Sequence, residues 1–310
     1  MKRVAVLYGG ISAERDVSLS SGKQVIAALR AANFDVVPVL VGSDLRAVLA
    51  ALDPAPDVVF NALHGRFGED GTIQGVLDWL GIPYTHSGVR ASALAMDKQA
   101  AKTVFAGAGL PVAVGAVVGV DALEADDPLP RPYVIKPLNE GSSVGVEILG
   151  DGDNRRAEIA RGWRFGPAAM VEEYIPGREI TVGVMGDRAL AVTEIRAEAG
   201  AFYDYESKYA AGGSRHQIPA AIHPDTYARA LDVAVAAHRA LGCRGASRAD
   251  FRLDESEAWG EDGPGRLVLL EVNTQPGLTP TSLLPEQAAY HGIGFPELCT
   301  WMVENAACRA

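Results

Sequence analysis

Cysteine, basic charge and long apolar runs are all scarce in this 310-residue sequence, and each shortage excludes a class of protein. The three cysteines, Cys243, Cys299 and Cys308, lack the spacing of metal ligands, and an odd number without a disulfide framework is typical of a reducing cytoplasm. The net charge of −11 argues against a nucleic-acid partner, which requires a basic face. No stretch approaches the roughly 20 apolar residues of a membrane helix, and the run after Arg3 stops at Gly9, too early for a signal-peptide core. We therefore expect a cytoplasmic protein that binds neither nucleic acid nor a membrane.

The usual nucleotide-binding fingerprints are missing as well. A buried strand over 3–8, a turn at Gly9-Gly10 and a helical pattern over 18–32 predict the start of a doubly wound α/β domain, whose ligands bind outside the carboxyl ends of its strands. The turn lacks Gly-x-Gly-x-x-Gly and an acidic ribose partner, which disfavours a dinucleotide oxidoreductase. The loop 136–145 follows a strand that delivers Lys136 and is rich in Gly and Ser, but it is no Walker loop. Its composition favours a flap over phosphates, with a hairpin turn and a solvated lysine as the alternative.

What the chain does contain is a pair of apolar segments carrying inward-facing polar residues. Ser247–Phe251 holds Arg248 and Asp250 two residues apart, and Leu269–Gly277 holds Glu271 and Asn273 at the same spacing. Alternation along a strand places each pair on one face. If the strands are neighbours, Asp250, Glu271 and Asn273 form the all-oxygen ligand set that Mg²⁺ prefers. The alternative is two edge strands with solvated polar faces.

The remaining elements predict two or three domains for a chain of this length. We expect strands over 36–41, 57–62 and 82–85, a glycine-bearing loop over 64–71, and a single helix over 92–107. A strand over 168–175 ends in acidic residues that suit an adenine amino group and ribose hydroxyls. The aromatic segment 202–209 and the Gly- and Ala-rich 210–215 make a long connection typical of a lid.

Several of these residues also have plainer interpretations. Glu14 can be an exposed first-turn residue stabilised by the helix dipole. A lone loop histidine such as His64 is usually only solvated, and acidic residues at strand ends usually are too. The order of the segments along the chain is therefore more informative than any one of them.

Taken in order, six segments resemble the D-alanine–D-alanine ligase family of ATP-grasp enzymes over nearly the whole chain. No single motif is decisive, but their order and spacing together are highly specific. The segments are Gly9–Ser18, His64–Gly71, Met96–Lys98, Lys136–Gly145, Tyr203–Tyr209 and Glu271–Gly277.

The resemblance implies an α/β, three-domain ATP-grasp fold with an N-terminal doubly wound, Rossmann-like domain. The domains would be 1–95 for substrate binding, 96–179 as the central ATP-grasp subdomain and 180–310 as the catalytic one. The reaction would be ATP-dependent ligation of two D-alanine molecules through D-alanyl phosphate, giving ADP and phosphate, for peptidoglycan precursor synthesis. Two Mg²⁺ ions, or Mn²⁺ in their place, would serve as cofactors, and the chain would form a homodimer.

The resemblance also assigns roles to residues. Lys98 and Lys136 would contact phosphates, Glu172 or the adjacent Glu173 would hold adenine beside the backbone of Tyr174 and Ile175, and Glu179 would hold the ribose. Phe202 and Lys208 would lie near the nucleotide, and Asp250, Glu271 and Asn273 would hold the metal. Glu14 would take the first D-alanine's ammonium with His64 nearby, Arg248 and the Gly277 N–H would form an oxyanion hole, and Ser282 and Leu283 would seat the second D-alanine. Ser142, Tyr209 and Glu14 would close the lid as a hydrogen-bonded triad.

Two alternatives stay open within and beyond this family. The nearest is another ATP-grasp carboxylate–amine ligase, or a depsipeptide ligase that would use D-lactate as the second substrate. The resemblance implies that a tyrosine at 209 in the lid favours an amine nucleophile. A non-catalytic ligand-binding module on the same scaffold would be expected to lack metal or oxyanion residues, yet Arg248, Asp250, Glu271 and Asn273 are all present.

Overall fold

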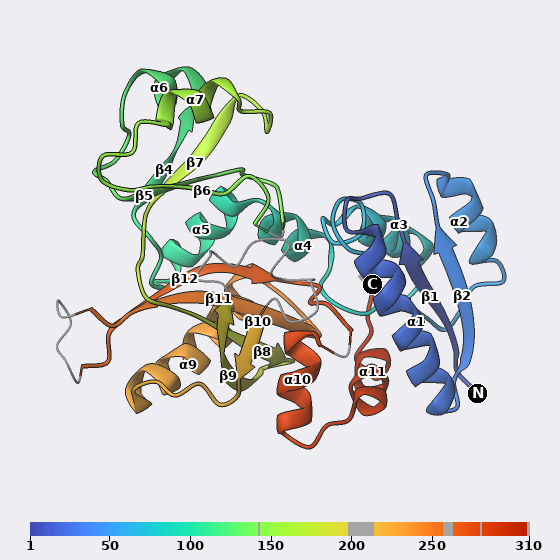
Figure 1. Ribbon diagram of the computed structural model, residues 1–310. Helices are drawn as coiled ribbons and strands as arrows, with labels where there is room; N and C mark the ends of the chain where they lie inside the picture. Colours follow the sequence, from blue (N-terminus) through green and yellow to red (C-terminus); the bar gives the residue numbers. More distant parts are fainter. Residues whose placement is uncertain (142, 198–213, 257–262, 280, 309–310) are drawn as a thin grey trace.

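The computed structural model contains three β-sheets that follow one another along the chain (Figure 1). It describes all residues except 142, 198–213, 257–262, 280 and 309–310. Each sheet lies mainly within one predicted domain, although β8 begins at Arg178 and crosses the predicted boundary at 179/180. The domain boundaries themselves stay a prediction.

The N-terminal domain is a parallel sheet covered on both faces. Its strand order is β2-β1-β3, and alternate residues of β1 enter two different cores. Val4 and Val6 pack with helix α1, whereas Ala5 and Leu7 pack with α2 and α3. The elements are β1 Arg3–Gly9, α1 Arg15–Ala31, β2 Asp35–Val41, α2 Leu45–Ala51, β3 Val58–Asn61 and α3 Thr72–Leu80.

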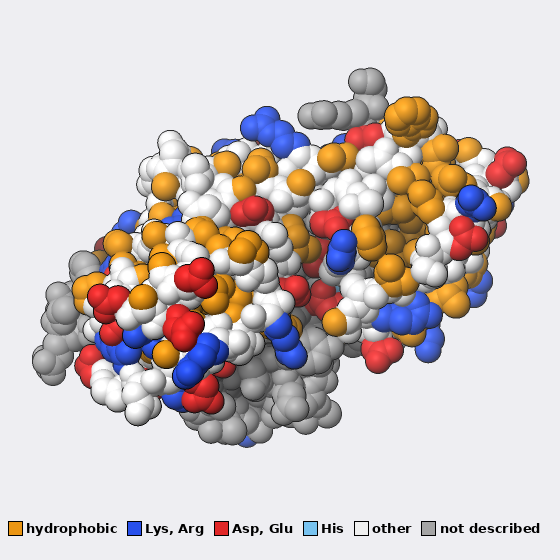
Figure 2. Space-filling view, turned by 90° about the horizontal axis from the view of Figure 1, so that it is seen from above, with side chains coloured by type: hydrophobic (Ala, Val, Ile, Leu, Met, Phe, Trp, Pro, Cys, Tyr) orange, Lys and Arg blue, Asp and Glu red, His pale blue; other side chains and the backbone are white. Residues whose placement is uncertain are grey.

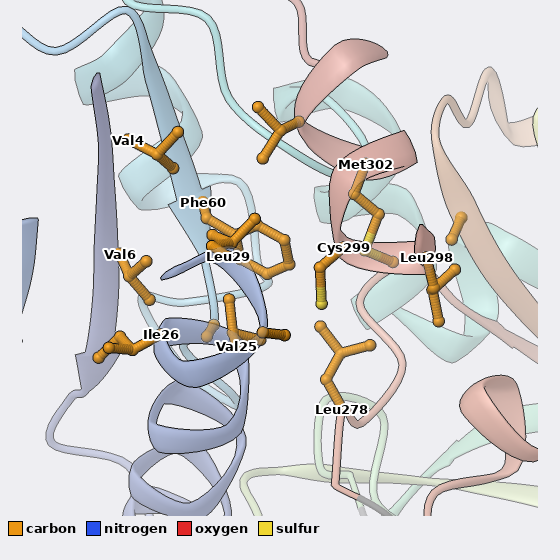
Figure 3. Close-up of a cluster of buried hydrophobic side chains, with 14 of the residues drawn as sticks. Val4, Val6, Val25, Ile26, Leu29, Phe60, Leu278, Leu298, Cys299 and Met302 are labelled. Atoms are coloured by element: carbon orange, nitrogen blue, oxygen red, sulfur yellow. The ribbon is translucent and has the colours of Figure 1, made fainter. Parts of the chain in front are cut away.

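The C-terminal end of the chain completes the first of these cores. Helices α10 (Leu283–Tyr290) and α11 (Phe295–Glu304) follow the last strand, and α11 lies against α1 and β3. Figure 3 shows Cys299 facing Val25 and Phe60 across this contact, with Leu298 and Met302 beside it on α11. Residues nearly 300 positions apart in sequence therefore share one hydrophobic core.

Two expectations for the connection between domains are wrong. The single helix predicted over 92–107 is two helices, α4 (Val89–Met96) and α5 (Lys98–Gly107). They separate at Asp97, whose backbone is extended and whose carboxylate accepts a hydrogen bond from the Ala100 N–H at 2.9 Å, as a helix N-cap does. The strand predicted over 82–85 is reduced to single bridges that Tyr84 makes with Val59 and Ala307.

The second sheet is antiparallel, has the order β4-β7-β5-β6, and is covered by helices on one face. Tyr133 and Ile135 of β5 and Val171 of β7 are buried in the core that lies over α6 and α7. Their neighbours in sequence therefore point to the opposite, open face. The elements are β4 Gly115–Gly119, α6 Val120–Ala125, β5 Tyr133–Lys136, β6 Glu147–Leu149, α7 Arg156–Arg161 and β7 Ala168–Glu173.

The third sheet has the order β10-β9-β8-β11-β12 and joins the two predicted metal-bearing segments as neighbours. Ala249, Phe251 and Leu253 of β11 enter a core with α5 and α9, so Arg248, Asp250 and Arg252 occupy the other face. Strand β12 carries a bulge at this point, because Asp250 pairs with Glu271 and Phe251 with Leu269, which leaves Leu270 without a partner on β11. The elements are β8 Arg178–Met185, β9 Arg188–Ala197, β10 Ser214–Gln217, α9 Pro224–Leu241, β11 Ala246–Asp254 and β12 Arg266–Asn273.

Candidate active site

A pocket lies between the open face of the second sheet and the polar face of the third. The strands on both sides direct alternate side chains into it, because their other residues are committed to the two cores. The pocket brings together every described residue that was predicted to bind ATP and two of the three predicted metal ligands. These are Lys98, Lys136, Glu172, Glu173, Tyr174, Ile175, Glu179, Asp250 and Glu271.

Glu172 is a buried carboxylate held between two lysines. Its Oε1 lies 2.5 Å from Nζ of Lys102 on α5, and its Oε2 contacts Nζ of Lys136 on β5. Burial raises the pKa of Glu172, but the two lysines outweigh this effect and hold the pKa below its usual value. The carboxylate is therefore charged at neutral pH and can accept hydrogen bonds.

Glu173, the next residue, is engaged differently. Its oxygens lie 2.5 and 3.0 Å from the guanidinium nitrogens of Arg266, and Oε1 also accepts a hydrogen bond from the Val114 N–H at 2.8 Å. The bonds from Arg266 lower the pKa of Glu173. Both carboxylates have partners, but those of Glu173 come from β12 and the segment before β4, whereas one partner of Glu172, Lys136, lines the pocket beside it. We therefore favour Glu172 for contacting a ligand.

The predicted metal ligands lie at the end of the pocket on β11 and β12. Asp250 is directly opposite Glu271 in the strand register, and Arg248 is opposite Asn273. Arg248 holds both oxygens of Asp250, at 2.8 and 2.6 Å, and Nζ of Lys98 is 4.0 Å from Glu271 Oε2. Two carboxylates and an amide on adjoining strands match the oxygen donors of a hard cation.

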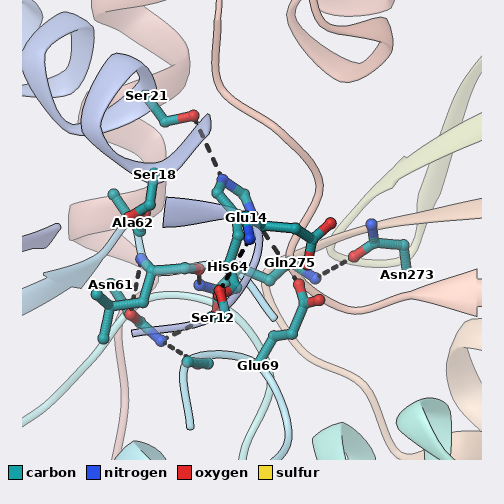
Figure 4. Close-up of polar contacts among 12 residues, drawn as sticks. Ser12, Glu14, Ser18, Ser21, Asn61, Ala62, His64, Glu69, Asn273 and Gln275 are labelled. Carbon is teal, nitrogen blue, oxygen red and sulfur yellow. Dashed lines mark hydrogen bonds and ion pairs between the residues drawn. The ribbon is translucent and has the colours of Figure 1, made fainter. Parts of the chain in front are cut away.

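A second polar cluster surrounds His64 and Glu14 at the carboxyl end of the N-terminal sheet (Figure 4). The His64 ring is buried, with Nε2 3.3 Å from Ser21 Oγ and Nδ1 3.9 Å from Glu69 Oε2. Ser12 Oγ donates to the His64 carbonyl at 2.7 Å and accepts from the Glu14 N–H at 3.2 Å. The start of α1 and the loop after β3 are thus tied into one unit.

The glycine-rich loop after β5 reaches this second cluster. A Cβ built on Gly141 would lie 3.9 Å from both carboxylate oxygens of Glu14. The adjacent residue of the loop contacts α5, because Nζ of Lys98 donates to the Glu140 carbonyl. Glu140 and Gly141 therefore lie where the pocket meets the N-terminal domain, and the flap stays a prediction.

Gln275 connects the two clusters through the protein interior. Its backbone N–H donates to Asn273 Oδ1 at 2.8 Å, its Oε1 accepts from Asn61 Nδ2 at 3.0 Å, and its Nε2 donates to the Leu63 carbonyl. The side chain is 1% exposed. Since Leu63 precedes His64, a predicted metal ligand and the histidine loop share one buried residue (Figure 4).

The segment after β12 places the last predicted residues side by side. A Cβ on Gly277 would lie only 2.9 Å from Ser282 Oγ, which in turn accepts from the Thr279 N–H at 2.9 Å. Ser282 precedes α10, and buried Leu283 is the first residue of that helix. Free N–H groups at a helix start attract anions such as carboxylates.

Comparison with known proteins identifies the family. The model of the D-ala D-ala ligase C-terminus matches residues 98–304, and that of the D-ala D-ala ligase N-terminus matches 3–55 and 49–87. The chain belongs to the D-alanine–D-alanine ligase family. It is 72% identical to the D-alanine–D-alanine ligase of Granulibacter bethesdensis over 100% of this chain and 99% of that protein. It is 73% identical to that of Acidiphilium cryptum over the full length of both chains.

Solved structures of the ligase family have the same architecture. The D-alanine–D-alanine ligase from Bacillus anthracis complexed with ATP has a TM-score of 0.81 at 28% identity, covering 98% of this chain and 97% of that one. A further structure of the Bacillus anthracis ligase has a TM-score of 0.82 at 30% identity, with the same coverage. The predicted family, the ATP-grasp fold class and the ligase class are therefore confirmed.

Ser142, Phe202, Lys208 and Tyr209 lie outside the described residues, so the predicted triad and part of the nucleotide site stay predictions. In the described part of the chain no three His, Cys, Asp or Glu side chains are grouped as metal ligands. The predicted set differs from such a group because its third member, Asn273, is an amide. None of the described helices is long and apolar enough to cross a membrane.

The structure adds three residues that the sequence analysis missed. Lys102 lies four positions after Lys98, which places both on one helix face, and Arg252 lies two positions after Asp250 on a strand. Those spacings were signals that could have identified them. Gln275 had no such signal, because its partners are more than 200 residues away in sequence.

Proposed function

We propose that this chain ligates two D-alanine molecules to D-alanyl-D-alanine, with ATP converted to ADP and phosphate through a D-alanyl phosphate intermediate. The observation that carries the proposal is the pocket that combines Lys98 and Lys136 with the opposed carboxylates Asp250 and Glu271, in a chain of the ligase family. The product would serve peptidoglycan precursor synthesis, and the protein would act in the cytoplasm.

The nucleotide would lie in the pocket between the two antiparallel sheets. Glu172, which is charged, would accept a hydrogen bond from the adenine amino group, aided by the backbone of Tyr174 and Ile175, and Glu179 would hold the ribose. Lys98 and Lys136 would bind the phosphates, and Phe202 and Lys208 would border the nucleotide. Phosphoryl transfer depends mainly on positioning and charge neutralisation, which these residues provide.

Asp250, Glu271 and Asn273 fit a hard cation and would hold two Mg²⁺ ions, or Mn²⁺ in their place. When bound, such ions neutralise charge on the transferring phosphoryl group. Asp250 is already oriented by Arg248 and by Thr181, whose Oγ1 lies 2.6 Å from Asp250 Oδ1. A site with prearranged ligands loses less entropy when it binds an ion.

The two D-alanine molecules would meet between the His64 cluster and the start of α10. Glu14 would bind the ammonium of the first, with His64 nearby. The carboxylate of this first D-alanine would attack the γ-phosphorus of ATP, and ADP would leave. The amine of the second would then attack the acyl phosphate carbon, and phosphate would leave. Ser282 and Leu283 would seat the second substrate's carboxylate and side chain.

The tetrahedral oxyanion formed in that step requires donors that are already in position. The Arg248 guanidinium and the Gly277 N–H would supply them, and losing one such donor typically costs about 10²–10³ in rate. The triad of Ser142, Tyr209 and Glu14 would close the lid and keep water from the acyl phosphate. Gly141 lies against Glu14, which supports this arrangement for the neighbouring Ser142.

A steady-state assay tests the proposal. Purified protein is given ATP, Mg²⁺ and D-alanine, with D-alanine, D-lactate or L-alanine as second substrate, and phosphate and product are measured. We expect phosphate release with D-alanine to exceed that with D-lactate at neutral pH. The reverse preference would indicate a depsipeptide ligase, and nucleotide binding without turnover would indicate a non-catalytic module.

A matched pair of variants tests the metal assignment. Asp250→Asn should strongly reduce turnover, because an amide replaces a charged metal ligand. Asp232→Asn, the same change at an exposed position of α9, should leave turnover unaltered. Full turnover of Asp250→Asn would remove Asp250 from the proposed metal site.

We further propose that two chains pair through their N-terminal domains. Figure 2 shows hydrophobic side chains gathered over that domain, at the right of the view. Leu40, Leu45 and Leu80 are about half exposed, and Trp79 is 92% exposed. Large exposed apolar groups are typical of association surfaces. Sedimentation of the wild type and of Trp79→Ser should show a dimer that the substitution weakens, and a wild-type monomer at micromolar concentration would contradict the proposal.

A further inference from the structure

Two lysines contact the single carboxylate of Glu172, so positive charge exceeds negative charge in this cluster. The Nζ atoms of Lys102 and Lys136 each contact a different oxygen of its carboxylate, and the three side chains are only 14%, 11% and 8% exposed. One carboxylate neutralises one ammonium group, so the cluster carries an excess charge of +1. One lysine can therefore leave while the other still neutralises the buried Glu172.

Lys102 and Lys136 differ in their access to a ligand. Lys136 lines the pocket from β5, and the glycine-rich loop that is proposed as a flap over the phosphates follows it directly. Lys102 is on α5, four residues beyond Lys98, and is not part of the pocket lining. A nucleotide in the pocket would therefore meet Lys136 first, while Lys102 stays on Glu172.

Recruitment of Lys136 by phosphate has a consequence for Glu172. A buried carboxylate without a cation is costly and tends to take up a proton. A protonated Glu172 would be a poorer acceptor for the adenine amino group. The two proposed contacts of the nucleotide, at its base and at its phosphates, therefore conflict unless a second cation stays on Glu172.

We infer that Lys102 is a positioning residue for ATP: it keeps Glu172 charged and oriented toward the base while it frees Lys136 to bind phosphate. This inference rests on the proposed function, because it uses the roles proposed for Glu172 and Lys136. Lys102 itself would make no contact with the nucleotide. It differs from a purely structural ion pair between α5 and β7 because it predicts an effect confined to ATP.

The first test separates ATP from the amino-acid substrate. In Lys102→Met the KM for ATP and the dissociation constant of a non-hydrolysable ATP analogue should rise about tenfold or more, the equivalent of one charged hydrogen bond. The KM for D-alanine should stay within about twofold. Lys102→Arg, which keeps the charge, should recover most of the ATP affinity. Unchanged ATP affinity in Lys102→Met, or an equal rise in both KM values, would overturn the inference.

A double-mutant cycle removes the remaining ambiguity. In a Glu172→Gln background there is no charge for Lys102 to hold, so adding Lys102→Met should have little further effect on ATP affinity. The same loss in both backgrounds would show that Lys102 acts independently of Glu172 and would overturn the inference. If Lys102→Met does not fold, Lys102→Gln replaces it with the same expectation, and melting temperatures are measured for every variant.

The outcome for Lys102 is distinguishable from the outcome for the proposed function. Wild-type protein that binds the ATP analogue but releases no phosphate with D-alanine would contradict the ligase proposal. The binding cycle on Lys102 and Glu172 could still be completed in that case, since it needs only the nucleotide. An active wild type with no coupling between the two residues would refute the Lys102 inference alone.

Discussion

Replacing Gln275 by leucine should destabilise the protein and weaken D-alanine binding together. Leucine has nearly the shape of glutamine, so packing at this buried position is retained and the loss is mainly polar. The substitution leaves an N–H of Asn61 Nδ2 and the Leu63 carbonyl without their present partners. Each buried polar group left unsatisfied costs about 1–3 kcal/mol, so we expect a loss of about 2–6 kcal/mol in the free energy of unfolding.

The effect on function follows from the position of the lost bonds. Leu63 leads into the loop that carries His64, and the Gln275 backbone holds the Asn273 side chain. We expect the KM for D-alanine to rise and kcat/KM to fall in Gln275→Leu even at temperatures where the protein remains folded, because a displaced binding group contacts the substrate less well and a small displacement lowers rates strongly. Urea unfolding followed by tryptophan fluorescence and steady-state kinetics measure the two effects.

Gln24→Leu is a matched control for this prediction. Gln24 is an exposed residue of α1, so the same change there should alter the free energy of unfolding by no more than about 0.5 kcal/mol. If Gln275→Leu behaved like Gln24→Leu in both assays, the buried network would not hold the histidine loop, and the reasoning would be wrong.

Three further predictions concern pH, the core and the turn before β8. Burial lowers the pKa of His86 to about 3, whereas in the unfolded chain its pKa is near 6.5, so the free energy of unfolding should fall by about 1.4 kcal/mol between pH 7.5 and 5.5. In urea unfolding His86→Asn should remove that part of the pH dependence, and asparagine tolerates the left-handed φ of 68° at this position. Met302→Ala should cost about 2–5 kcal/mol by opening a cavity in the N-terminal core, and a melting temperature equal to wild type would show that α11 is not part of it. Gly177→Ala should raise the KM for ATP, because a Cβ there would lie 2.1 Å from the Leu253 carbonyl oxygen and force the segment after Ile175 to move; an unaltered KM would contradict this.

Local patterns in the sequence were sufficient for most of the elements. The alternation at Asp250 and Glu271 predicted that both carboxylates leave their strands on one face, and the register places them opposite each other. The glycine-rich turns and apolar runs located the parallel strands of the first domain. These features depend on neighbours within a few residues, which the order of amino acids directly displays.

Other features were outside the reach of local patterns. The break at Asp97 was missed because aspartate is tolerated within a helical pattern until its side chain caps the next helix. The choice between Glu172 and Glu173 depended on Arg266, which comes from another sheet. The place of α11 in the N-terminal core depended on a long return of the chain.

The sequence by itself therefore determined the family, the fold class and many of the residues that line the pocket, because motif order and strand alternation are properties of the linear chain. The tertiary structure alone decided which groups meet. It put Lys102 beside Glu172, turned Glu173 toward Arg266, and joined Gln275 to Asn61 and Leu63. The physical reason is that ion pairs and buried hydrogen bonds act over about 3 Å, whatever the separation of the residues along the chain.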